Sequence, residues 1–147
     1  MKTKKATWFE TTIKYEKTGE NGEMCKISEV YAIDAMSFTE AEKEMAKEAN
    51  NFLKNDSYEI TAIKIANYGE VIMSDDNDDD KYYLATLDFT EESNSGKEKH
   101  TRVNYLVQAS SLDKAVKHIN EMMSGSMMEY KSMSVKETKV ADILYHD

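Results

Sequence analysis

The sequence predicts an α+β fold in which a strand–strand–helix–strand unit occurs twice. The first observation is an internal repeat: residues 8–46 recur 74 positions later, so that Tyr31 falls on Tyr105. Past the middle of each half the offset is 72, and Tyr58 falls on Tyr130. A tandem duplication of this kind predicts two like units related by an approximate two-fold axis.

The length of 147 residues is that of one ordinary domain. We therefore expect a single domain, residues 1–147, built from repeats of about 7–73 and 81–145 that share one hydrophobic interior. The acidic segment 74–80 would join them. The sheet should be mainly antiparallel and carry two helices.

The second observation is the alternation of apolar and polar residues with period two. It predicts a half-buried strand over 8–16 and another over 26–35. Residues 17–22 are polar with two glycines and predict a hairpin loop between them. Because crossovers are right-handed, the first strand should lie centrally, antiparallel to the other two strands of its unit.

The third observation is a helix signal after the second strand. Ser37 and Glu40 have the capping-box spacing, in which each side chain satisfies an N–H group at the helix start. A strand of about 58–73 should follow, interrupted near 67–69. The apolar stripe expected on the helix is Phe38, Ala41, Met45, Ala49 and Phe52.

The second repeat should contain the same elements in the same order. Its helix would be capped by Ser110 or Ser111. The expected elements are strands of 82–90, 101–109 and about 129–144, a loop at 91–99, and a helix of about 111–123.

Composition limits the class of protein. The formal charge is −9, which argues against a protein whose affinity comes from neutralising phosphates. The longest apolar run falls short of the ~20 residues that span a bilayer, so no membrane partner is expected. The single Cys25 excludes an internal disulfide and fits a reducing compartment, so we expect a cytoplasmic protein.

The acidic segment has two interpretations. The favoured one is a solvated connector whose like charges keep it extended. The other is a calcium loop, because Asp75, Asn77 and Asp79 have D-x-N-x-D spacing. An EF-hand also requires Gly at the sixth position and Glu at the twelfth, where this chain has Asp80 and Thr86. We therefore expect no metal and no cofactor.

The sequence contains no recognised catalytic motif that would support an enzyme. The three histidines, His100, His118 and His146, share no metal-ligand spacing and are expected at the surface. Cys25 has no Cys-x-x-Cys context, and the sequence contains no glycine-rich phosphate loop. We expect a protein that is not an enzyme, with an unrecognised enzyme left open.

Aromatic residues supply the candidate binding residues. Phe9 and Tyr83 share a strand face with the apolar positions and should pack under the helices. Trp8 and Tyr82 point to the opposite face, which favours them for contact with a ligand or a partner. With the nearby cations the candidate set is Trp8, Lys14, Lys81, Tyr82 and Arg102.

Five short motifs carry a resemblance to a known family. They are WFETTIKY at 8–15, DAMSFTEAE at 34–42, TAIK at 61–64, KYY at 81–83 and LVQA at 106–109. With them the chain resembles a family of uncharacterised small proteins, a domain of unknown function found in Bacteroidetes and their phages. The resemblance implies a cytoplasmic bacterial or phage protein. It brings no activity and no site residue.

These observations predict a non-enzymatic binding module of phage or mobile-element origin. It would engage a protein partner or sequester a small anionic ligand such as a nucleotide signal. The alternative is a single-stranded nucleic-acid-binding accessory protein of replication or transcription, which would use the aromatic strands. A homo-oligomer is left open.

Overall fold

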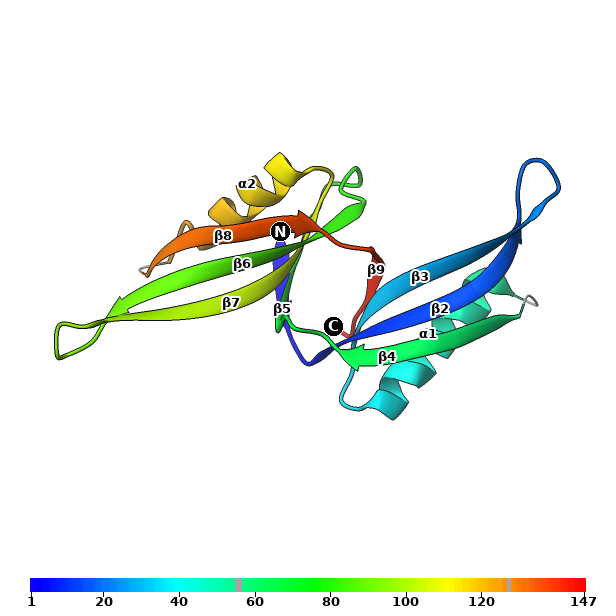
Figure 1. Ribbon diagram of the computed structural model, residues 1–147, viewed down its shortest axis with the longest axis horizontal. Coiled ribbons are helices and arrows are strands. Elements are labelled where there is room, and N and C mark those ends of the chain that lie inside the picture. The colour runs from blue at the N-terminus through cyan, green and yellow to red at the C-terminus, as the bar shows by residue number, and fades with distance from the viewer. Residues whose placement is uncertain (55–56, 127) are drawn as a thin grey trace. The chain divides into compact units, whose positions relative to one another are not determined.

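The computed structural model describes residues 1–54, 57–126 and 128–147. These residues form the expected α+β fold, with two helices and mixed, mostly antiparallel sheets (Figure 1). The elements are β1 (Lys2–Lys5), β2 (Trp8–Thr18), β3 (Met24–Asp34), α1 (Phe38–Leu53), β4 (Tyr58–Ile65), β5 (Glu70–Met73), β6 (Lys81–Glu92), β7 (Glu98–Ala109), α2 (Leu112–Met123), β8 (Glu129–Glu137) and β9 (Val140–Leu144).

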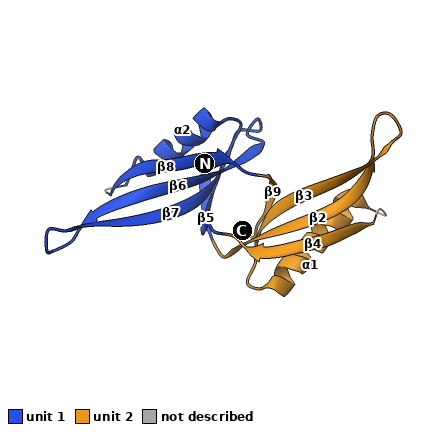
Figure 2. Cartoon of the chain, in the orientation of Figure 1, with its two compact units in different colours: residues 1–5, 67–138 blue, residues 6–66, 139–147 orange. Residues whose placement is uncertain are grey.

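The chain divides into two compact units (Figure 2). Unit 1 contains residues 1–5 and 67–138, and unit 2 contains residues 6–66 and 139–147. These bounds differ from those of the predicted repeats because the last strand of each repeat is split in two. In the first repeat, the second part of this strand is β5, which pairs with β7 of the second repeat. In the second repeat it is β9, which pairs with β3 of the first repeat.

The sheet of unit 2 has the strand order β4-β2-β3-β9. As predicted, the first strand of the repeat, β2, lies between the other two and runs antiparallel to both. The edge strand β9 pairs in parallel with β3, with Leu144 opposite Ile33. Beneath α1 the core consists of Phe9, Ile13, Tyr31, Ile33, Ala35, Ala41, Met45, Ala49 and Leu53.

Helix α1 begins at the expected cap. The Ser37 side chain accepts a hydrogen bond from the Glu40 N–H at 3.1 Å, and the Glu40 carboxylate accepts one from the Met36 N–H at 3.3 Å. The ends of the predicted apolar stripe differ from its middle. Phe38 is 51 % exposed and Phe52 is 40 % exposed, and each packs edge-on against one ring of the sheet, Phe9 and Tyr15 respectively.

The sheet of unit 1 has the strand order β1-β5-β7-β6-β8. β6 is central among the strands of its repeat and antiparallel to β7 and β8, while β5 pairs in parallel with β7. The order β8-β6-β7-β5 matches β4-β2-β3-β9 of unit 2, which is the topology that a duplication predicts. Beneath α2 the core consists of Ile72, Tyr83, Ala85, Leu87, Phe89, Tyr105, Val107, Ala109, Ala115, Ile119 and Met123.

Both predicted hairpin loops are present. Gly22 and Gly96 have φ values of 76° and 77° in the turns that connect β2 to β3 and β6 to β7, a conformation that side chains with a Cβ disfavour. The two helices contain 16 and 12 residues. Among the described residues, no helix is long and apolar enough to cross a membrane.

The structure decides which serine caps α2, and this generates a prediction. The Ser111 side chain accepts a hydrogen bond from the Lys114 N–H at 3.2 Å. We expect Ser111→Ala to lower the free energy of unfolding by about 1 kcal/mol, since the N–H group loses its acceptor. The neighbouring Ser110→Ala is the matched control and should change it by less than ~0.5 kcal/mol. Urea denaturation measures both, and equal losses would contradict the assignment.

Candidate functional site

A groove runs beside helix α1 in unit 2. The helix packs on β2, β3 and β4, and the edge strand β9 lies beyond it. A helix with its side chains is about 10 Å wide and strands are about 4.8 Å apart, so one helix covers two or three strands. The fourth strand of this sheet is therefore left with an open face toward the helix, and the groove lies there.

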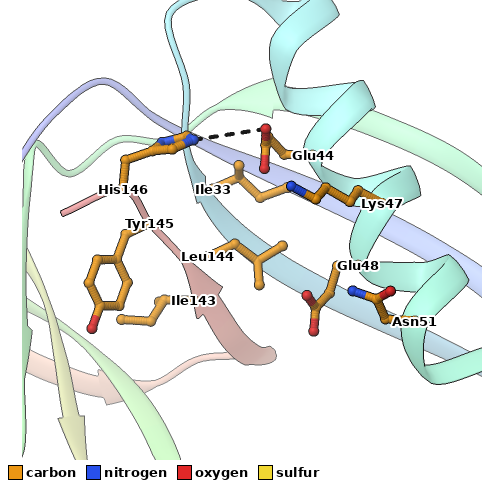
Figure 3. A pocket seen from close by; sticks show the side chains of 9 residues that line it. All are labelled: Ile33, Glu44, Lys47, Glu48, Asn51, Ile143, Leu144, Tyr145 and His146. Atoms are coloured by element: carbon orange, nitrogen blue, oxygen red, sulfur yellow. Dashed lines mark ion pairs between the residues drawn. The ribbon is translucent and has the colours of Figure 1, made fainter.

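The groove has a volume of about 430 Å³, within the range of ligand pockets in proteins. Helix α1 forms one wall with side chains spaced at i, i+3, i+4 and i+7, which lie on one face. Strand β3, strand β9 and the residues after β9 form the floor and the other wall (Figure 3). The lining residues are Ile33, Glu44, Lys47, Glu48, Asn51, Ile143, Leu144, Tyr145 and His146.

His146 closes one end of the groove. Its Nε2 atom lies 3.8 Å from the Glu44 carboxylate, and its Nδ1 atom lies 3.7 Å from the Asp34 carboxylate (Figure 3). The backbone N–H of His146 also donates to Asp34 at 3.3 Å. These contacts attach the segment after β9 to both α1 and the end of β3.

The chemistry of the groove is that of a binding surface. Leu144 provides a half-buried apolar side chain, while Ile33 opposite it is fully buried in the core, and Figure 3 shows Glu48 and Asn51 at the end away from His146. The two carboxylates, Glu44 and Glu48, outnumber the single ammonium of Lys47 in the lining. The wall is therefore able to pair with cations and to accept hydrogen bonds over a hydrophobic base.

In unit 1 the segment that follows the matching strand, β5, is residues 74–80, which we call the acidic loop. It docks on α2 through Lys114, whose Nζ atom lies 2.7 Å from Asp79 Oδ1 and 2.6 Å from Asp76 Oδ2. Asp79 is only 2 % exposed. Residues 75–78 and 80 are exposed, as expected of a solvated connector, but the segment is not free in solvent throughout, because Asp79 is buried against a cation of the neighbouring helix.

Two further groups hold Asp79 in place. The Ser74 hydroxyl donates to Asp79 Oδ2, and the Gln108 side chain donates to the Asp79 carbonyl at 2.8 Å. Burial alone would raise the pKa of Asp79, but hydrogen bonds from Lys114 and Ser74 outweigh it and lower the pKa below its ordinary 3.8. The Asp79 carboxylate is therefore ionised and paired.

One of the three histidines is buried, contrary to expectation. His118 is 7 % exposed; its Nδ1 atom lies 3.0 Å from the Gln108 carbonyl, and its Nε2 atom lies 3.7 Å from Asp79 Oδ2. The acidic loop covers it. The side chains of His100 and His146 are each 53 % exposed, as predicted for surface histidines.

The residues of the weak calcium candidate do not converge. Asp79 pairs with Lys114, while Asp75 accepts a hydrogen bond from the amino group of Met1. Over the ranges 1–54, 57–126 and 128–147, no three His, Cys, Asp or Glu side chains gather in an arrangement suited to a metal ion. Asp75, Asn77 and Asp79 thus form part of a docked loop.

The two candidate aromatic residues are buried. Trp8 is 1 % exposed and Tyr82 is 3 % exposed, so neither side chain projects from an open sheet face. Alternation placed them correctly on the face opposite Phe9 and Tyr83, which lie in the helix-covered cores. A contact of Trp8 or Tyr82 with a ligand stays a prediction, and this structure offers it no open surface.

The three candidate cations are exposed and lie apart from the groove. Lys14 lines a separate shallow hollow of about 350 Å³ with Tyr15 and Tyr58. Lys81 Nζ lies 3.9 Å from a Glu137 carboxylate oxygen. Arg102 stands opposite Asp88 in the pairing of β6 with β7. Lys81 directly precedes Tyr82 on β6, whereas Lys14 lies further along β2 from Trp8 and Arg102 lies on β7.

The groove residues were not among the sequence candidates. The polar face of α1 shows Glu44, Glu48 and Asn51 at helical spacing, but a polar helix face is ordinarily solvated. The sequence gives no indication that β9 pairs with β3 and carries His146 to this face. The missing information is a pairing between residues more than 100 positions apart.

A comparison with protein-family models matches residues 7–146 to DUF4494, a domain of unknown function. Comparison with curated proteins gave no match, and neither did comparison with solved structures.

The acidic loop generates a second prediction. We expect Lys114→Met to lower the free energy of unfolding by about 2 kcal/mol near neutral pH, because Asp79 stays buried without its cation. The lowered pKa of Asp79 contributes stability that is fully present above pH 3.8 and is lost as the pH falls through the folded-state value. The difference between wild type and variant should therefore shrink below pH 3.8.

Urea titrations at several pH values measure this difference. Lys117→Met, on the exposed side of the same helix, is the matched control and should change stability by less than ~0.5 kcal/mol. A loss at Lys114 no larger than that at Lys117, or one that does not depend on pH, would refute the docking of the loop through this pair.

Proposed function

We propose that this chain, which belongs to the DUF4494 family, is a non-enzymatic binding module whose α1 groove engages a protein partner. We use the name α1 groove for the hollow lined by α1, β3, β9 and residues 145–146. The observation that carries the proposal is this groove, in which the polar side chains of α1 face the half-buried Leu144.

The make-up of the groove favours a protein over a small molecule. Protein interfaces combine an apolar centre with a polar rim, and here the half-buried Leu144 lies among Glu44, Glu48 and His146. The residues at the start of α1 add a second apolar surface. Met36 is 91 % exposed and Phe38 is 51 % exposed. Large apolar side chains that lie close together in solvent are typical of surfaces that bind another protein.

The other predicted functions have less support at the same sites. A small anionic ligand, such as a nucleotide signal, would meet the carboxylates of Glu44 and Glu48 in the groove and be repelled. A single-stranded nucleic acid would need accessible rings for stacking, whereas Trp8 and Tyr82 are buried. Both functions remain predictions, and protein binding is the one we carry forward.

The origin and location of the protein are part of the same proposal. The motif resemblance supports a protein of Bacteroidetes or their phages, and the formal charge of −9 with a single exposed Cys25 supports a cytoplasmic one. A module of this kind would act by occupying a surface of its partner.

Site-directed cross-linking tests the proposal. The photoreactive amino acid p-benzoylphenylalanine is placed at Asn51, which lines the groove, and the full chain is produced in cells of its native host. Illumination should give a discrete covalent product with one protein, identified by mass spectrometry.

Asn50 supplies the matched control, since it is exposed and adjacent on α1 but is not a lining residue. Successive helix positions point about 100° apart, so a probe at Asn50 should give little of the same product. Equal products from both positions, or none from Asn51, would refute a partner in the groove.

A further inference from the structure

The sheets of the two units differ by one strand. The order β8-β6-β7-β5 of unit 1 matches the order β4-β2-β3-β9 of unit 2, and in unit 1 the strand β1 also pairs with the outer side of β5 (Figure 1). Within the described ranges, the sheet of unit 2 ends at β9 and has no strand in the place of β1. The same edge is therefore covered in one unit and uncovered in the other.

The strands β5 and β9 present matching residues at this edge. Glu70 of β5 stands opposite Tyr105 of β7, and Asp142 of β9 stands opposite Tyr31 of β3. The internal repeat aligns the two tyrosines, and both acids are followed by two apolar residues. These apolar pairs are Val71 with Ile72 and Ile143 with Leu144. What pairs with β5 in unit 1 thus indicates what β9 is able to receive.

The burial of the two strands differs in the direction that a missing neighbour predicts. Ile72 is fully buried, whereas Leu144 at the matching position is only half-buried. One residue further on, Met73 is 5 % exposed and Tyr145 is 39 % exposed. The end of β9 is therefore more accessible than the end of β5.

A backbone group of β9 is satisfied by a local side chain. The Ile143 N–H donates a hydrogen bond to the Asp142 carboxylate at 2.8 Å. Short polar side chains that accept a nearby backbone N–H compete with the hydrogen bonds of a sheet ladder. A strand added to an exposed sheet edge obtains its affinity from such ladder bonds. An incoming strand at β9 would replace this local bond with a bond to its own backbone.

The strand that covers the edge in unit 1 is basic. β1 has the sequence Lys-Thr-Lys-Lys and runs antiparallel to β5, with Lys5 opposite Glu70. Opposite charges at facing positions stabilise an antiparallel pair. In unit 2 the matching acid is Asp142, whose side chain is exposed. A strand that lies on β9 as β1 lies on β5 would place its residue in the position of Lys5 opposite Asp142.

We propose that the outer edge of β9 receives an extended segment of a protein partner, antiparallel to β9 and with lysine or arginine opposite Asp142. The segment extends the sheet of unit 2 to five strands, as β1 does in unit 1. A second copy of the chain is a poorer occupant, because its β1 would have to leave its own β5 and would exchange one strand pairing for another. This surface goes beyond the α1 groove and does not depend on it.

A peptide titration tests the proposal on the full chain. The probe is a blocked peptide with the sequence of residues 1–6, Met-Lys-Thr-Lys-Lys-Ala, because β1 already shows that this sequence pairs with the matching edge. It is added into the millimolar range, since a strand of four residues binds weakly. Amide signals of the ¹⁵N-labelled protein should shift saturably at residues 140–145, with nuclear Overhauser contacts between the fifth peptide residue and Asp142.

Two altered peptides separate strand pairing from attraction to an acidic protein. In the first, the backbone nitrogens of residues 2–5 are methylated, which keeps every charge but removes the N–H groups that a ladder needs. In the second, each lysine is replaced by glutamate. Both should bind at least threefold more weakly than the unaltered peptide.

A matched pair of protein variants tests the position of the charge. Asp142→Asn keeps a side-chain oxygen for the Ile143 N–H but removes the charge, and it should weaken binding of the unaltered peptide about threefold. Glu20→Gln has the same net charge and alters an exposed carboxylate in the β2–β3 turn of the same unit. It should leave the affinity nearly unchanged.

Each contrary outcome removes a different part of the proposal. Equal binding of the methylated peptide would overturn strand pairing, and equal weakening in both variants would overturn the charge at Asp142. No shift at residues 140–145, or shifts at residues 70–73 alone, would overturn the site. A dimer of the chain that excess peptide dissociates would identify a second copy as the occupant and overturn a partner. Cross-linking at Asn51 reports on the α1 groove separately, so the proposed function stands or fails independently of these results.

Discussion

The arrangement of both units depends on one packing constraint: a single helix is too narrow to cover a sheet of four or five strands. In unit 2, α1 covers β2, β3 and β4, and β9 lies beyond it. In unit 1, α2 packs on β7 and β8 with β6 between them, Ile72 of β5 reaches the edge of the core beneath the helix, and β1 lies beyond β5. Each sheet therefore extends beyond its helix on one side, and we call this part of the sheet its shoulder. The residues that lie on the shoulder distinguish the two units.

The exchange of strands determines which residues reach each shoulder. Because β9 pairs with β3, the residues after it lie against α1, about 100 positions away in sequence. Because β5 pairs with β7, the acidic loop lies against α2. In unit 1 the loop buries Asp79 with Lys114, and in unit 2 the contact of His146 leaves most of the groove accessible. The candidate site is thus a consequence of topology combined with a change of charge on the helix.

Much of the fold was predictable because its signals are local. Alternation identified the long strands, capping residues identified the start of each helix, and the crossover rule placed β2 and β6 centrally. The duplication stays a prediction, which the matching strand orders favour. Whether the halves share one interior also stays a prediction.

What could not be predicted depends on long-range pairing. A strand pattern gives the face of each residue but not the sheet to which the strand belongs, so the destinations of β5 and β9 were missed. Alternation likewise placed Trp8 and Tyr82 on the correct face without showing that it is covered. His118 and Asp79 were assigned to solvent because their burial depends on each other, across residues of the acidic loop and α2.

The most direct test of this account is a nuclear Overhauser measurement of the two parallel strand pairs in solution. The account predicts cross-strand contacts between Ile33 and Leu144 and between Ile72 and Val107, which join β9 to β3 and β5 to β7. Contacts that instead place residues 70–73 beside β3 and residues 140–144 beside β7 would keep each strand within its own repeat. That result would contradict the exchange, and with it the groove as described.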